Sequence, residues 1–210
     1  MKIQKITSAF TTNTYYVESG SESILVDASH KGIVEFVQIP PKNLLLTHGH
    51  VDHIEELEFL RSKFGIEVIL QKQGQEMLTN PMMNGSALFG GMPPLVCKPA
   101  EIVFESEEFT YQFGESTLHF LHTPGHSPDS SIFYSKEEKV LFCGDLIFEN
   151  SIGRSDFPHS NTKIHLENVE KVLKEFPDDT MVYPGHGEPF LLGKAKRDIS
   201  MVVEYVKQMG

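Results

Sequence analysis

The sequence predicts an α/β protein of the α+β kind: a four-layer αββα sandwich, in which two mixed β-sheets are flanked by helices. Three observations lead to this fold class. Short apolar runs rich in β-branched residues recur in the first half, helical stretches lie between them, and the second half again places strands before helices. Two sheets that bury one face against each other and cover the other with helices accommodate this order.

The first half of the chain holds four expected strands with helices between them. The strands span residues 15–18, 24–27, 44–47 and 67–70, and a helix is expected over 31–37. A clearer helix is expected over 54–64, because apolar residues recur there at helical spacing and Gly65 supplies a C-terminal stop.

The second half opens with a hairpin and closes with helices. Strands are expected at 110–113 and 116–121 around the turn at Gly114, then at 131–134, 139–143 and 180–183. Helices are expected over 163–176 and 194–209. The stretch from 80 to 99 is rich in Met, Phe, Gly and Pro and has no clear period, which is typical of a functional loop.

Length and composition set limits on the class of protein. A chain of 210 residues with 40% hydrophobic residues is expected to fold as a single domain over residues 1–210. The formal net charge of −11 argues against nucleic acid as a partner. No membrane association is expected, and the N-terminus lacks the apolar core of a signal peptide, so we expect a cytoplasmic protein in which Cys97 and Cys143 stay unpaired.

Metal-binding residue types are concentrated in four segments, each of which begins where an expected strand ends. Three histidines and an aspartate fall between positions 48 and 53, and three further candidates each directly follow a glycine. The seven candidate ligands are His48, His50, Asp52, His53, His126, Asp145 and His186. Strand ends on a rigid sheet can direct several side chains to one point. A divalent metal is the simplest partner for such a set, whereas the alternative is a solvated His-rich loop.

Spacing within the first segment indicates two neighbouring metal positions. His48 and His50 lie two residues apart and share a face of an extended segment, while Asp52 and His53 belong to the turn into the next helix. Two divalent metal ions are therefore expected. Imidazoles combined with carboxylates favour zinc, with iron or manganese as alternatives.

With these motifs in place, the sequence resembles the metallo-β-lactamase superfamily, and within it the small glyoxalase II-like (hydroxyacylglutathione hydrolase-like) hydrolases. The resemblance covers the His-x-His-x-Asp-His signature at 48–53, Thr-Pro-Gly-His at 123–126, Gly-Asp at 144–145, Gly-His at 185–186 and the segment 151–158. It implies a metallo-β-lactamase-like fold. It also implies that His48, His50 and His126 bind one metal, that Asp52, His53 and His186 bind the other, and that Asp145 bridges both.

The resemblance also implies an activity: hydrolysis of a small-molecule thioester or ester by a metal-bridging hydroxide, which Asp52 orients as the catalytic residue. A thiolate leaves without prior protonation, which favours thioesters over amides. Long glyoxalase II enzymes carry a further C-terminal helical domain that binds glutathione. Only 24 residues follow His186, so no such domain is expected here.

Several alternatives stay open at the level of the sequence. A persulfide dioxygenase with one iron, a hydrolase of lactones or other esters, and a non-catalytic metal-binding module share parts of the pattern. Arg154 is a candidate for binding a substrate carboxylate, or it pairs with Asp156. The loop at 82–89 lines the substrate pocket or simply packs, the remaining histidines are expected to be structural or solvated, and the protein is a monomer or a homodimer.

Overall fold

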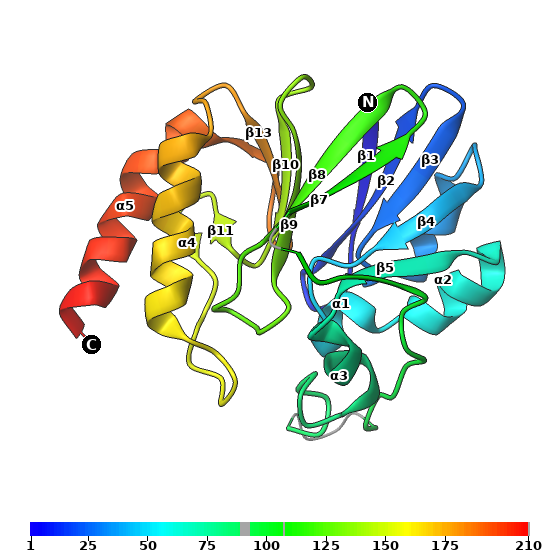
Figure 1. Cartoon of the computed structure of the whole chain (residues 1–210), viewed down its shortest axis with the longest axis horizontal. Helices are drawn as coiled ribbons and strands as arrows, with labels where there is room; N and C mark the ends of the chain where they lie inside the picture. The colour runs from blue at the N-terminus through cyan, green and yellow to red at the C-terminus, as the bar shows by residue number, and fades with distance from the viewer. Residues whose placement is uncertain (89–92, 107, 210) are drawn as a thin grey trace.

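A computed structural model describes residues 1–88, 93–106 and 108–209, and these form two six-stranded sheets packed face to face (Figure 1). The first sheet has the order β1-β2-β3-β4-β5-β6. Its strands are β1 (Lys2–Thr7), β2 (Asn13–Ser19), β3 (Glu22–Val26), β4 (Pro41–Leu45), β5 (Glu67–Gln71) and β6 (Ile102–Phe104). β1, β2 and β3 pair antiparallel, whereas β3, β4, β5 and β6 pair in parallel, so the sheet is mixed.

The second sheet has the order β14-β13-β10-β9-β8-β7. Its strands are β7 (Glu108–Phe113), β8 (Ser116–His122), β9 (Ser131–Ser135), β10 (Val140–Gly144), β13 (Met181–Pro184) and β14 (Phe190–Leu191). β10 and β13 pair in parallel and the other neighbours pair antiparallel. A short ribbon of β11 (Ile147–Phe148) and β12 (Ser151–Ile152) follows β10.

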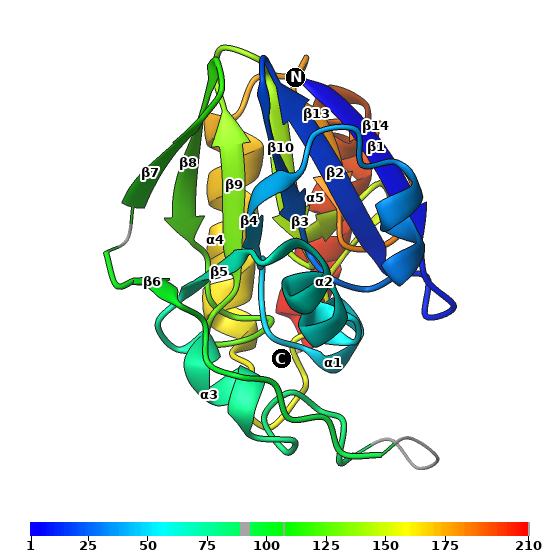
Figure 2. The ribbon, with the colours of Figure 1, turned by 90° about the vertical axis from the view of Figure 1, so that its right-hand side faces the viewer.

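Helices cover the outer side of each sheet. Helices α1 (Val51–Ile54), α2 (Leu57–Phe64) and α3 (Gly74–Thr79) belong to the first sheet, and Figure 2 shows α1 and α2 in front of it. Helices α4 (Thr162–Glu175) and α5 (Leu192–Met209) lie beside the second sheet at the left of Figure 1. The layers therefore follow the predicted αββα order.

Alternation along the strands builds three apolar layers. Tyr15 and Val17 of β2 belong to the cluster between the sheets, together with Phe120 and Phe142 from the second sheet. Tyr16, which lies between them in sequence, belongs to the cluster under the helices of the first sheet. Successive side chains of a strand point to opposite faces, so one strand serves both layers.

The structure corrects some of the expected elements. The helix expected over 31–37 is a 3₁₀ helix, η1 (Lys31–Glu35), and the helix expected over 54–64 is divided into α1 and α2. Gly65 ends α2 in the left-handed conformation, as expected. The pattern gave no prediction for β1, α3 and β6, because their apolar residues are few or only partly buried.

Two further expectations concern the cysteines and the membrane. Both cysteines are buried and free, with Cys143 in β10 and Cys97 in the stretch that returns from the 80–99 loop. Among the helices of the described ranges, none is long and apolar enough to cross a membrane. Part of the predicted loop, residues 89–92, lies outside the described residues.

Candidate metal centre

The motif-bearing segments meet at one end of the two sheets. The run 48–53 follows β4, and the loops with His126, Asp145 and His186 follow β8, β10 and β13. Those last three strands run in the same direction, so their C-terminal ends share one edge of the sheet. Gly144 allows close approach of the sheets there, because a Cβ at this position would lie 2.7 Å from Thr47 Oγ1.

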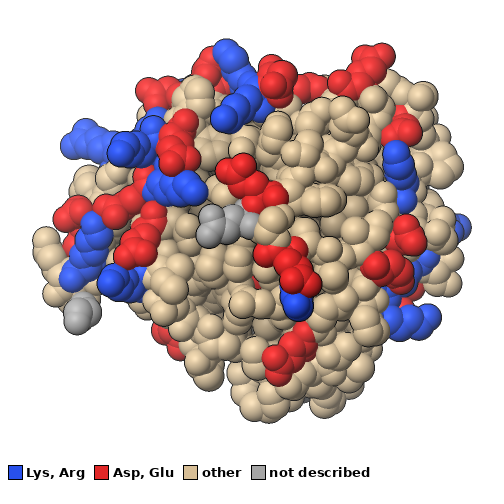
Figure 3. Space-filling model, viewed as in Figure 1, with Lys and Arg blue, Asp and Glu red and all other residues tan. Residues whose placement is uncertain are grey.

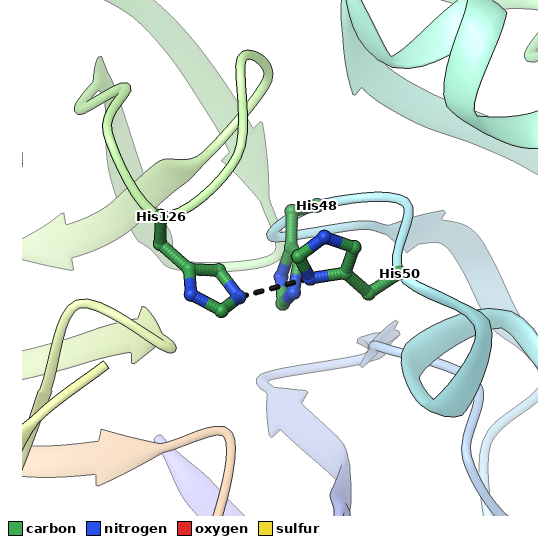
Figure 4. Close-up of side chains that lie close together, drawn as sticks. All are labelled: His48, His50 and His126. Atoms are coloured by element: carbon green, nitrogen blue, oxygen red, sulfur yellow. Dashed lines mark hydrogen bonds between the residues drawn. The ribbon is translucent and has the colours of Figure 1, made fainter. Parts of the chain in front are cut away.

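Three histidines form the first group of possible ligands. His48, His50 and His126 offer ring nitrogens that lie within 4.8 Å of one another, and Figure 4 shows their rings directed toward one point. The closest approach is between His50 Nδ1 and His126 Nε2, at 2.9 Å. All three side chains are buried.

A second group lies beside the first and consists of Asp52, His53 and His186. Asp145 lies between the groups: its Oδ1 is 3.3 Å from His53 Nε2, and its Oδ2 is 3.3 Å from His186 Nε2. The same Oδ2 is 3.6 Å from His126 Nε2 in the first group. We call the seven residues the ligand cluster: His48, His50, Asp52, His53, His126, Asp145 and His186.

Unpartnered polar atoms test whether a metal fits this cluster. His48 Nε2, His53 Nε2 and Asp145 Oδ1 are buried and make no hydrogen bond, since the 3.3 Å between the last two lacks hydrogen-bond geometry. A buried polar atom without a partner is costly, and several in one place indicate a missing ligand. Nitrogen and carboxylate donors around a common point are the donors that zinc, iron and manganese accept. The residues therefore fit divalent metal ions.

The protonation states of His48, His50 and Asp145 agree with this reading. Burial, with the neighbouring histidines, lowers the pKa of His48 and His50 well below the usual value, so these imidazoles are neutral and can donate a lone pair to a metal. Burial opposes ionisation of Asp145, but His53, His186 and His126 outweigh it and hold the pKa of its carboxyl well below the usual range. A neutral first group beside the anionic carboxylate of Asp145 is suited to cations.

Hydrogen bonds fix the direction of the ligand side chains. His53 Nδ1 lies 2.8 Å from Asp27 Oδ2, which leaves Nε2 toward the cluster, and His126 Nδ1 lies 2.6 Å from the Arg154 carbonyl oxygen. Asp27 also accepts from the Thr47 N–H and has φ +59, a conformation that few non-glycine residues adopt. Sequence reasoning assigned Asp27 no role, although its place at the end of an apolar strand resembles that of Asp145.

His159 is the second residue that sequence reasoning missed. It was expected to be structural or solvated, but it lines the cavity over the cluster, and its Nε2 lies 3.2 Å from His50 Nε2. Because His50 Nδ1 faces the cluster, the opposite nitrogen is free to donate a hydrogen bond to His159. No motif marks His159, so its proximity to His50 could be found only from the fold.

The cluster lies in a cavity of about 780 Å³, a volume typical of small-molecule sites. Part of its lining is apolar and comes from separate elements; we call Phe10, Phe148, Ile152 and Phe157 the apolar wall. Asn84 and Gly85 bring the predicted 80–99 loop to the cavity. Arg154 also lines it, but its guanidinium pairs with both Asp156 carboxylate oxygens, at 2.7 and 2.9 Å.

Together, the αββα sandwich and the histidine-rich cluster at its edge define a class of metallo-hydrolases. The sequence model described as "Metallo-beta-lactamase superfamily" matches residues 7–186. The chain belongs to the metallo-β-lactamase superfamily.

Individual relatives carry more specific names. YqgX of Bacillus subtilis, a probable metallo-hydrolase, is 32% identical over 180 residues, which cover 83% of this chain and 84% of that protein. Hydroxyacylglutathione hydrolase GloC of Haemophilus influenzae is 30% identical over 164 residues, which cover 78% and 77% of the two chains.

Solved structures agree with the fold. BLEG-1 B3 metallo-beta-lactamase has a TM-score of 0.85 at 32% identity, covering 92% of this chain and 95% of that one. TTHA1623 in a di-iron-bound form has a TM-score of 0.80 at 29% identity, covering 96% and 100%. ETHE1 from Myxococcus xanthus, at 22% identity and a TM-score of 0.75, shares the fold.

Proposed function

We propose that this chain is a metal-dependent thioester hydrolase of the glyoxalase II (hydroxyacylglutathione hydrolase) type. The observation that carries the proposal is the arrangement of two ligand groups around Asp145 at the base of a cavity. A relative named hydroxyacylglutathione hydrolase supports a thioester substrate.

Two divalent ions would be held by the ligand cluster. His48, His50 and His126 would bind one ion, and Asp52, His53 and His186 the other, with Asp145 between them. Zinc fits the donors best, and a di-iron-bound structure of a similar protein makes iron the main alternative, with manganese also possible. When bound, such a pair supplies Lewis acidity and a water that ionises near neutral pH.

Asp52 is the residue that orients the attacking water. Its Oδ2 accepts a hydrogen bond of 2.7 Å from Thr12 Oγ1 and lies 3.3 Å from His186 Nε2, so the carboxylate is fixed at the cavity floor. Burial opposes its ionisation, but His53 and His186 hold the pKa of Asp52 well below the usual range. The ionised carboxylate is therefore available to accept a hydrogen bond from the water and orient it.

The leaving group favours a thioester. A thiolate, whose conjugate acid has a pKa near ~8.5, leaves without a proton, whereas an amine needs one. His159 is the histidine above the cluster, and burial together with His126 lowers its pKa, which makes it a poor proton donor at neutral pH. The site is better suited to thioesters than to amides.

A substrate panel tests the proposal directly. Purified protein loaded with zinc, iron or manganese is assayed against thioesters, lactones and a β-lactam, and oxygen uptake is recorded with glutathione persulfide. Thioester cleavage with kcat/KM well above that for the other esters is expected. Turnover of lactones or β-lactams alone, or oxygen uptake without thioester cleavage, would exclude the proposal.

A further inference from the structure

The apolar wall encloses the ligand cluster from two sides. The Phe157 ring lies 5.0 Å from the His50 ring beside the first group, and the Phe148 ring lies 5.9 Å from the His186 ring beside the second. A substrate whose carbonyl reaches the cluster would therefore have an aromatic ring on each side.

Phe10 adds a third phenylalanine ring to the lining of the same cavity. It is 51% exposed at the turn between β1 and β2, yet it lines the cavity. The residues that follow it anchor the turn, since Thr12 donates to Asp52 and Thr11 Oγ1 lies 3.4 Å from His186 Nδ1. An exposed apolar ring held in place at a cavity mouth indicates a binding surface.

The small number of positive side chains around the cavity also favours an uncharged substrate. Among the described lining residues, Arg154 is the one Lys or Arg, and its planar fork is occupied by Asp156. The guanidinium carbon also lies 4.4 Å from the centroid of the Phe157 ring. On the face seen in Figure 3, most Lys and Arg side chains lie toward the left, top and right margins, and the blue patch near the centre lies between acidic side chains.

A thiol carrier with free carboxylates or phosphates would meet a single Lys or Arg side chain in the described lining, Arg154, and Asp156 already pairs with it. We infer that the substrate is an uncharged thioester whose aryl or larger alkyl group packs between Phe10, Phe148 and Phe157. This inference rests on the proposed function, because it names the substrate class of the same site. It assigns selectivity to the apolar wall and reaction chemistry to the ligand cluster.

The acyl half of the inference is tested with thioesters of one neutral thiol, N-acetylcysteamine. The metal-loaded protein should cleave the phenylacetyl thioester with a kcat/KM at least tenfold above that for the acetyl thioester. Phe148→Ala and Phe10→Ala should each reduce this ratio several-fold. Phe59→Ala is the matched control, because Phe59 is 42% exposed on α2 and does not line the cavity, and its ratio should equal that of the wild type.

The second part of the inference, that the thiol carrier is uncharged, is tested with one acyl group attached to two different thiols. The lactoyl thioester of N-acetylcysteamine should be cleaved with a kcat/KM at least tenfold above that of the lactoyl thioester of glutathione. Asp156→Ala releases the Arg154 guanidinium and should raise kcat/KM for the glutathione conjugate. A wild-type preference for glutathione, or a phenylacetyl-to-acetyl ratio near one, would overturn the inference.

Failure of the proposed function gives a different result. If no thioester is cleaved, binding of the ketone analogue of phenylacetyl-N-acetylcysteamine, with CH₂ in place of sulfur, is measured by calorimetry. Tight binding that Phe148→Ala weakens tenfold would keep the apolar wall as the binding surface while the hydrolysis is abandoned. Binding that neither phenylalanine variant changes would overturn the inference on its own.

Discussion

The ligand cluster and the apolar wall share one cavity but are built in opposite ways. Most of the cluster is buried and held by hydrogen bonds: His53 is 0% exposed and His48 1% exposed, and Asp27, Thr12 and the Arg154 carbonyl fix the rings and carboxylates. The wall is held by a turn and a short ribbon, and its Phe10 is half exposed. The difference indicates that the chemistry resides in a rigid base, while selectivity resides in a surface that can change at small cost to the fold.

Removing the charge of Asp145 should have the largest effect, because this carboxylate lies between both groups. Asp145→Asn keeps the shape but leaves the histidines without their common anion. We expect the bound metal to fall below that of the wild type and kcat/KM for a thioester to fall by ~10³-fold or more, which corresponds to ~4 kcal/mol. Elemental analysis and kinetics on the same sample measure both, and unchanged metal content with full activity would remove Asp145 from the centre.

The framework beneath the cluster should respond to pH through Asp129. This buried carboxylate accepts from the Gly49 N–H at 2.8 Å and from Ser127 Oγ at 2.7 Å, and thus joins the 48–53 run to the His126 loop. Burial raises the pKa of Asp129 to about 6, although both hydrogen bonds act in the other direction. Because the pKa is raised on folding, the folded state favours the protonated carboxyl. The resulting stabilisation is complete below the pKa of the unfolded state and is lost as the pH rises through about 6.

Asp129→Asn removes this titration while keeping the side-chain shape. In metal-free protein, we expect the unfolding free energy of the wild type, relative to the variant, to increase by ~2 kcal/mol as the pH falls from ~7 to ~4. Denaturant titrations at several pH values measure this difference. A difference that does not change with pH would show that folding does not raise the pKa of Asp129.

His159 connects the two regions, since its ring stacks on Phe157 at an interplanar angle of 6° and its Nε2 approaches His50. His159→Leu should weaken metal binding by ~10-fold to 100-fold, the range found when the outer partner of a ligand histidine is lost. His159→Gln keeps a hydrogen-bond acceptor and should restore most of the affinity. Competition with a chromogenic chelator measures the affinities, and equal values for the two variants would assign His159 to the wall alone.

The smallest effect should come from the wall itself. Phe10→Ala removes a ring that is 51% exposed, so we expect the free energy of unfolding to change by less than ~0.5 kcal/mol and the metal affinity to stay constant. Thermal unfolding and the same chelator competition check this. A loss of metal from this variant would mean that cluster and wall are not separable.

The sequence predicted the four layers and the positions of most strands along the chain, because apolar runs mark strands locally. The strands at β2, β3, β8 and β10 were found within a few residues of their bounds. β1 was not predicted, because its residues are only partly buried. The segment expected as a helix over 31–37 forms the short 3₁₀ helix η1, in which only Ile33 is buried. Elements without a buried stripe give little pattern to read.

In the candidate site, too, some residues could be predicted from the sequence and others could not. The members of the ligand cluster were all predicted as ligands because they lie in short motifs, and the structure brings them together, while their metal-binding role stays a prediction. His159 and Phe10 carry no motif, and their positions depend on how the 151–161 segment and the β1–β2 turn fold over the cluster. A substrate pocket assembled from distant segments cannot be predicted from local spacing.

Metal content and thioesterase activity, measured on one preparation, test the central claim most directly. Protein purified, stripped with chelator and titrated with zinc should regain cleavage of an N-acetylcysteamine thioester in step with bound metal, up to two ions per chain. Stripped protein that still cleaves the thioester at the full rate, or protein that takes up two ions without gaining activity toward any thioester, would contradict it.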